Sequence, residues 1–98
     1  MADAKFHLGK LVATPGAIKA LADAGQEAQH FLSLHQSGAW GDLDREDRKT
    51  NDEAIAHEGD LDRQQRVLSA YTTRLGVKLW VITEWDRMLT SILLPDEY

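Results

Sequence analysis

The sequence predicts an α+β fold: a short N-terminal strand, three helices, and then a three-stranded antiparallel β-meander packed on the helices. Near Arg66 the spacing of apolar residues changes from about 3.6, which is typical of helices, to 2, which is typical of strands. Before that point, helix-capping residues mark three helices, and after it two hairpin-sized joins separate three apolar runs. We expect a single domain, 1–98, with a helical part at about 14–58 and a sheet part at about 66–94.

The residues FHLGKLVAT, at positions 6–14, are typical of a short first strand. A helix over 15–24 is expected next, because residues typical of helix ends flank this segment. Thr14 suits the N-cap, Pro15 suits the first helical position, and Gly25 suits the left-handed C-terminal cap. The side of this helix that faces the core is expected to carry Ala17, Ile18, Leu21 and Ala22.

A second helix is expected within QEAQHFLSLHQSG, positions 26–38, where Gly38 closes the segment. Its buried stripe, with helical spacing, comprises Ala28, Phe31, Leu32 and His35. A third helix is expected at about 45–57, where Asp44 caps the helix and Asp47 lies three residues later. Its few anchors are Leu43, Thr50, Ala54 and Ile55, so we expect it to be held weakly.

The segments RVLSAYT, VKLWVITE and LTSILL predict three strands, rich in β-branched and aromatic residues. Residues Glu84–Arg87 are then expected to form a hairpin turn between the last two strands. In the middle strand, Trp80 and Ile82 point away from the side that packs on the helices. An apolar outer face of this kind usually marks an interface.

Composition and charge narrow the functional classes. The 98 residues include no cysteine, so disulfides, thiolate zinc sites and cysteine nucleophiles are excluded. No apolar run is long enough to span a bilayer and no secretory signal is apparent, so a cytoplasmic protein without membrane partners is expected. The segment 42–62 carries nine acids and three bases, whereas 63–94 carries five bases and two acids. Such an uneven charge distribution is typical of interaction surfaces, and equally of a solvated helix followed by an ordinary sheet.

No metal site or cofactor is predicted. Four acids, at positions 42, 44, 46 and 53, match the first, third, fifth and twelfth positions of an EF-hand calcium loop. Asp47, however, stands where that loop needs glycine, and a helix N-terminus explains the acids without a metal. His30 and His35 are five residues apart and diverge on a helix, and His57 has no second histidine at zinc-site spacing.

One functional hypothesis is a small RNA-cleaving, toxin-like domain. Helices followed by an antiparallel sheet with basic residues resemble, in layout only, small ribonuclease toxins of the barnase and RelE types. A ribonuclease needs an acid or base beside the 2′-hydroxyl and a cation on the phosphate. Arg66, Tyr71 and Arg87 are the candidates for these catalytic roles. The net charge of −5 counts against this hypothesis, because phosphate contacts supply most nucleic-acid affinity.

The preferred hypothesis is a small non-enzymatic protein that binds another protein, or a second copy of itself as a homodimer through the outer sheet face. Aromatic and arginine side chains dominate interface hot spots, and the candidates here are Tyr71, Trp80, Trp85 and Arg87. A second, acidic surface would comprise Asp44, Glu46, Asp47, Asp52 and Glu53. The simpler interpretation is that Trp80 packs in a core and Trp85 folds back from a turn.

Three stretches, GDLDREDRKTNDEA, RVLSAYT and KLWVITEWDRMLTSILLPDEY, resemble a family of small uncharacterised bacterial proteins associated with plasmids and phages. The likeness runs from about Gly9 to Tyr98, but TTRLG and GDLDRQQR depart from the family pattern. Members are described as hypothetical or plasmid-related proteins, and some as type I restriction endonuclease subunit M. That last label does not fit, because the chain lacks the Asn/Asp-Pro-Pro-aromatic motif of a DNA methyltransferase. The resemblance implies an accessory protein of mobile genetic elements, regulatory or directed against host defence, and it carries over no functional residues.

Overall fold

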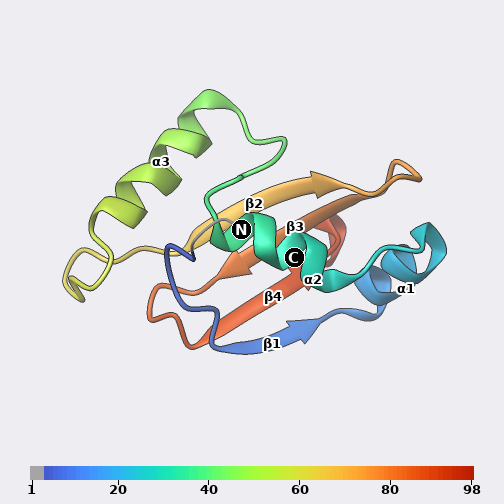
Figure 1. Cartoon of the computed structure of the whole chain (residues 1–98), viewed down its shortest axis with the longest axis horizontal. Helices are drawn as coiled ribbons and strands as arrows, with labels where there is room; N and C mark the ends of the chain where they lie inside the picture. Colours follow the sequence, from blue (N-terminus) through green and yellow to red (C-terminus); the bar gives the residue numbers. More distant parts are fainter. Residues whose placement is uncertain (1–3) are drawn as a thin grey trace.

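The computed structural model describes residues 4–98, so the first three residues of the expected domain lie outside the described residues. The fold is α+β, with one strand, three helices and three antiparallel strands in chain order (Figure 1). The elements are β1 (Lys10–Ala13), α1 (Pro15–Ala24), α2 (Ala28–Gln36), α3 (Arg45–Ala56), β2 (Val67–Thr72), β3 (Lys78–Thr83), β4 (Leu89–Leu93) and the 3₁₀ turn η1 (Pro95–Glu97). No helix within residues 4–98 has both the length and the apolar character needed to cross a membrane.

The sheet has the order β1-β4-β3-β2. The strands β2, β3 and β4 form the predicted antiparallel meander, and β1 adds to it in parallel beside β4. The sheet is therefore mixed, and the strand first in sequence lies next to the last one. A parallel neighbour needs a long crossover, which the three helices between β1 and β2 supply together with the meander.

The capping residues of the helices act as the sequence predicts. The Thr14 hydroxyl accepts a hydrogen bond from the Ala17 backbone N–H, and Gly25 ends α1 at φ 63° in the left-handed region. Asp44 caps α3 by accepting a bond from the Asp47 backbone N–H at 2.8 Å. These caps satisfy backbone groups that have no partner inside a helix. The first strand, in contrast, spans only Lys10–Ala13 of the expected 6–14.

The expected inner face of α1 was partly wrong. Ala17 and Leu21 are buried as predicted, but Ile18 is 56% exposed and Ala22 is exposed as well. Ala20 and Ala24 are buried in their place. Thr14 alone separates β1 from α1, so the short connection sets the rotation of the helix. The side that meets the sheet carries mostly alanine, which lets the helix backbone approach β4 closely.

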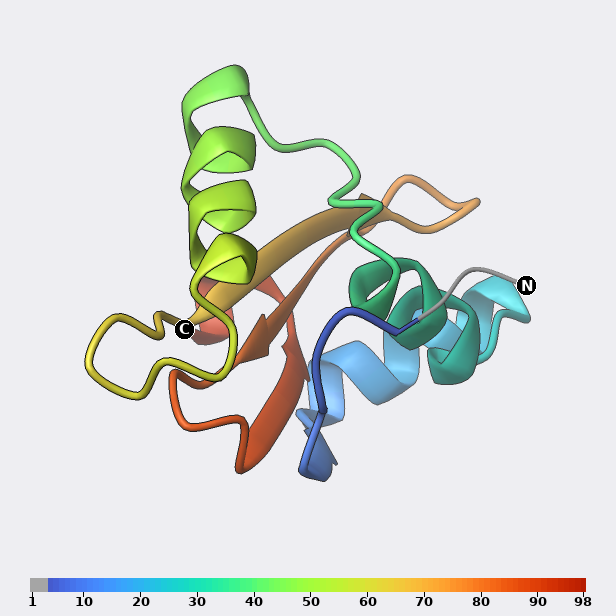
Figure 2. The same ribbon diagram turned by 60° about the vertical axis from the view of Figure 1, so that its left-hand side comes forward.

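The helices pack against the sheet in two groups. Helices α1 and α2 pack over its middle, whereas α3 stands apart beside β2 (Figure 2). The core under α1 and α2 comprises Ala17, Ala20, Leu21, Phe31, Leu32, Tyr71, Leu79, Val81 and Ile92. A smaller cluster between the N-terminal segment, α3 and β2 comprises Phe6, Trp40, Leu43, Ala54 and Val67. With this small share of apolar contacts, α3 needs polar contacts as well.

The free side of the edge strand β2 is closed by other parts of the chain. The Ala70 backbone N–H donates to the Trp40 carbonyl at 3.1 Å, and its carbonyl accepts from the Asp42 N–H at 2.6 Å. Gly41, at φ 77°, lies so close to the Ala70 carbonyl that a Cβ atom would overlap it. Further along, the Asn51 side chain donates to the Leu68 carbonyl and accepts from the Leu68 N–H. Its amide thus takes the place of a neighbouring strand.

Replacing Asn51 with alanine should therefore lower the free energy of unfolding by about 2 kcal/mol, since two backbone groups of Leu68 would lose their partner. Urea titration followed by circular dichroism measures this change. Thr50→Ala is the matched control, because the Thr50 side chain is exposed and, among residues 4–98, hydrogen-bonds only the Glu46 carbonyl one turn back. Equal midpoints for the two variants would contradict the role given to Asn51.

The outer face of the sheet is apolar, as the sequence indicates, and the chain itself covers part of it. Ile82 and Leu93 are only 4% and 6% exposed, and η1 packs against β3. Trp80 is half-buried, with the Tyr98 ring edge-on at 5.8 Å between centroids. Towards β2 and α3 the outer face stays partly open, because Leu68, Ala70 and Trp80 are only half-buried.

Candidate functional site

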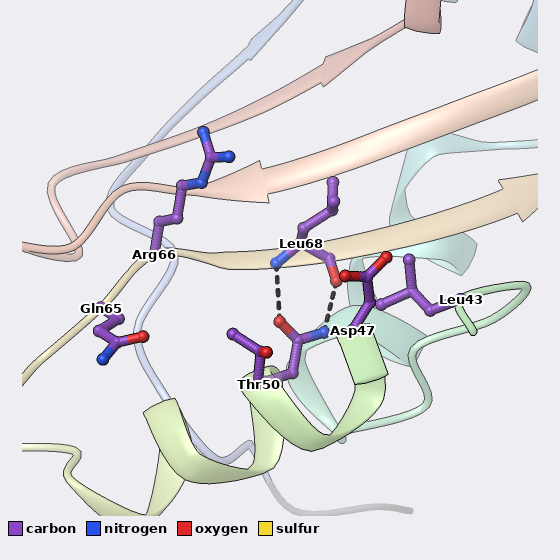
Figure 3. Close-up of a pocket in the computed structure, with 7 residues that line it drawn as sticks. Leu43, Asp47, Thr50, Gln65, Arg66 and Leu68 are labelled. Atoms are coloured by element: carbon purple, nitrogen blue, oxygen red, sulfur yellow. Dashed lines mark hydrogen bonds between the residues drawn. The ribbon is translucent and has the colours of Figure 1, made fainter. Parts of the chain in front are cut away.

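A groove runs between the N-terminal half of α3 and the outer side of β2. We call it the α3–β2 groove; it consists of two hollows of about 180 and 290 Å³ that share Leu43, Asp47 and Leu68. In Figure 3, Leu43 and Asp47 lie at one end of the first hollow, and Gln65 and Arg66 lie at the other. The second hollow continues past Leu68 to Ala70 and Trp80.

The two walls of this groove differ in character. The sheet side presents Leu68, Ala70 and Trp80, which are neighbours because Ala70 pairs with Trp80 across β2 and β3. The helix side presents three carboxylates, from Asp42, Asp44 and Asp47. Single cations stand at the two ends, Arg66 in the first hollow and Lys78 in the second. The groove therefore combines an apolar floor with an acidic wall.

The predicted acidic residues divide between the groove and the solvent. Asp44 and Asp47 line the groove, and both are exposed. Glu46 and Glu53 are exposed on α3 outside it, and Asp52 accepts a bond at 3.1 Å from the Trp40 indole N–H. Among residues 4–98, no three histidine or acidic side chains converge as a metal site would require.

The four predicted binding residues do not share one surface. Trp80 lines the groove, whereas Trp85 is 53% exposed at the tip of the β3–β4 hairpin. Tyr71 is buried on the helix-covered face, where its hydroxyl donates to the Ala39 carbonyl at 2.5 Å and burial raises its pKa to about 12. Arg87 is buried as well. The aromatic surface expected from the sequence is thus reduced to Trp80 and the largely buried Tyr71, which both line the second hollow.

Arg87 contacts three segments that are distant from it in the sequence, at Phe6, Glu58 and Gln65. Its Nε and Nη2 atoms donate to the Glu58 carboxylate, with the shortest contact at 2.8 Å. Its Nη1 donates to the carbonyls of Gln65 at 2.7 Å and Glu84 at 2.9 Å. The guanidinium carbon also lies 5.5 Å from the centre of the Phe6 ring. The predicted hairpin turn at Glu84–Arg87 is present, and Arg87 takes a positive φ of 59° in it.

The three residues of the ribonuclease hypothesis lie in three different environments. Arg66 is exposed beside the groove, where Nη1 donates to the Tyr98 hydroxyl at 2.6 Å. Tyr71 points into the helix-covered core, and Arg87 is paired with Glu58. Arg66 lines the first hollow of the groove and Tyr71 lines the second, but Arg87 lines neither, so the three side chains do not face a common space.

A buried polar chain runs through the core from α2 to the N-terminal segment. His35 lies 2.5 Å from the Ser69 hydroxyl through Nδ1 and 2.9 Å from the Thr83 hydroxyl through Nε2. Thr83 contacts Thr90 at 2.7 Å, and Thr90 donates to the Leu8 carbonyl. Because a carbonyl only accepts, the proton of Thr90 is committed to Leu8, and Thr83 must donate to Thr90. His35 then carries its proton on Nε2, and Ser69 donates to Nδ1.

This network stabilises the neutral form of His35. Burial lowers the pKa of the imidazole from 6.5 to about 3, and the positive charge of Arg87 adds to the shift. Such a base would pair well with a serine nucleophile in an open site. Here His35 and Ser69 are both fully buried, and neither lines the groove. The pair is therefore part of the core.

Sequence reasoning missed Asn51 and Glu58 as anchors of α3 and its C-terminal loop. A signal was present, because Asn51, Ala54, Ile55 and Glu58 follow the spacing of one helix face. Polar residues at both ends of a short apolar stripe indicate buried polar partners. The structure supplies those partners as Leu68 and Arg87.

No protein-family model, curated protein or solved structure matches the chain.

Proposed function

We propose that this chain is a small non-enzymatic protein that binds a protein partner, and that the α3–β2 groove receives an extended segment of that partner. The observation that carries the proposal is the junction of an apolar floor and an acidic wall in one groove. A segment with a lysine or arginine beside an apolar side chain complements both walls. The half-buried Trp80 offers the aromatic contact that often dominates such interfaces.

The resemblance to plasmid- and phage-associated proteins supports an accessory role in mobile genetic elements, regulatory or directed against host defence. A basic partner surface is consistent with both roles, because nucleic-acid-binding proteins of hosts and plasmids carry such surfaces. The three carboxylates of the groove favour a basic protein segment over nucleic acid, whose phosphates they would repel.

Capture of tagged protein from bacterial lysate tests this proposal when the protein and nucleic acid in the eluate are both identified. We expect one stoichiometric protein with the wild type, and at least about tenfold less of it with Asp47→Lys or Trp80→Ala. Glu53→Lys makes the same charge change on the exposed part of α3 outside the groove, and should retain the partner.

Circular dichroism of each variant shows whether the fold is retained. A partner bound equally by all three variants would place the interface elsewhere. Nucleic acid that survives moderate salt, with no protein partner, would contradict the proposal as a whole.

A further inference from the structure

The second edge of the sheet, formed by β1, is open. The backbone N–H groups of Lys10 and Thr14 donate to the Met88 and Ile92 carbonyls of the β4 segment, at 2.9 and 3.0 Å. Because backbone groups alternate along a strand, those of Leu11 and Ala13 point away from β4. β1 is the last strand in the sheet order, and no element within residues 4–98 lies beyond it in either view (Figures 1 and 2).

This edge is also apolar. Leu11 is 51% and Val12 is 39% exposed, and Lys10 is the one charged residue in the strand. Exposed edge strands with apolar side chains tend to pair with another strand. An extended segment on β1 would satisfy the outward backbone groups and cover both side chains.

When two copies of β1 run antiparallel, the positive charge of one copy lies opposite a negative charge near β1 of the other. Opposing Val12 to Val12 of a second copy places Leu11 opposite Ala13, and Lys10 opposite Thr14. Thr14 in turn donates through its hydroxyl to the Glu97 carboxylate at 2.5 Å. Lys10 and Thr14 lie on the same side of the strand, so Lys10 of one copy faces the Glu97 carboxylate of the other, twice.

The same register uses every outward backbone group of the strand. Leu11 and Ala13 form two symmetry-related pairs, and each pair exchanges both of its backbone hydrogen bonds. Pro15 has no N–H and begins α1, so pairing ends naturally at Thr14. A second copy therefore fits this edge well, because it places an acid opposite Lys10. A segment of the same length without that acid would leave Lys10 unpaired.

We propose that β1 is a homodimer interface, in which two copies of the chain join their sheets by antiparallel β1–β1 pairing around Val12. The two four-stranded sheets then form one continuous sheet of eight strands, with an α3–β2 groove at each end. The interface is independent of what the grooves bind, and it differs from the outer-face dimer considered from the sequence alone.

Sedimentation velocity over a range of protein concentrations tests the proposal. We expect the wild type to shift from monomer to dimer as its concentration rises. Leu11→Pro removes an outward N–H that β4 does not use, and should weaken the dimer at least about tenfold. Lys10→Glu should also weaken it, by placing like charges opposite each other, and more strongly at low salt. Lys49→Glu, the same charge change on exposed α3, should leave the dimer intact.

Circular dichroism verifies that each variant is folded, and Lys10→Glu keeps the test decisive should Leu11→Pro unfold. A wild type that stays monomeric at millimolar concentration would overturn the proposal. So would a dimer that Trp80→Ala abolishes and Lys10→Glu does not, because that result places the interface on the outer face of the sheet.

Discussion

Replacing Arg87 with alanine is expected to lower the free energy of unfolding by about 3–5 kcal/mol. The side chain is 5% exposed, and that of Glu58, its partner, is 24% exposed. Removing the guanidinium leaves a partly buried carboxylate without its counter-charge and takes a donor away from the Gln65 and Glu84 carbonyls. Denaturant unfolding followed by tryptophan fluorescence measures the loss.

Two further variants separate charge from shape. Arg87→Lys keeps the positive charge but cannot form the forked contact with Glu58, so we expect an intermediate loss. Arg66→Ala is the matched control, because this exposed arginine hydrogen-bonds only the Tyr98 hydroxyl within the described part of the chain. Its replacement should lower the free energy of unfolding by less than about 1 kcal/mol. Similar losses for Arg66→Ala and Arg87→Ala would show that the Glu58 pair contributes little.

The second large effect is a loss of stability in mild acid. The pKa of His35 is 6.5 in the unfolded chain and about 3 in the folded chain. Between these two pH values the imidazole is therefore protonated in the unfolded chain and neutral in the folded chain. Stability is therefore full above pH 6.5 and falls as the pH decreases towards 3. Between neutral pH and about pH 5, we expect a loss of about 2 kcal/mol from this residue.

Urea titrations at several pH values above the range of ordinary carboxylates measure this dependence. His35→Gln can preserve the contacts to Ser69 and Thr83 without a titrating ring, and should flatten the profile even where it lowers stability overall. His30→Gln changes an exposed histidine of the same helix and should retain the wild-type profile. A profile that His35→Gln leaves unchanged would contradict the assignment.

The local parts of this fold are predictable from the sequence because short-range chemistry determines them. Thr14, Pro15 and Gly25 delimit α1 correctly, and the alternation in the last third of the chain gives the three antiparallel strands. The position of β1 beside β4 was not predictable, since periodicity reports which side of a strand is buried and not which strand is its neighbour. The rotation of α1 about its axis also depends on packing. Ile18 was therefore expected on the buried side because it is apolar, but it is exposed.

The candidate site was predictable only in part. Composition correctly indicated an acidic α3 and an apolar outer sheet face, but the groove exists because residues 40–42 pair with Ala70 and bring the acids to Trp80. Arg87 was misleading, because a charged residue in a hairpin turn normally lies in solvent. Its burial depends on Glu58, a partner 29 residues away that no local pattern connects to it.

The closure of the β2 edge by Gly41 and Asn51 determines what kind of assembly this sheet permits. A sheet with two open edges can add strands at both edges and grow into a fibre. A sheet with a single open edge can pair with one other copy, and the joined sheet then has no open edge left. If β1 pairs with its own copy, the outer edges of the joined sheet are both β2, and each is already occupied by the amide of Asn51 and the backbone around Gly41. In such a dimer, the Asn51 side chain that anchors α3 would also prevent further strands from adding at β2.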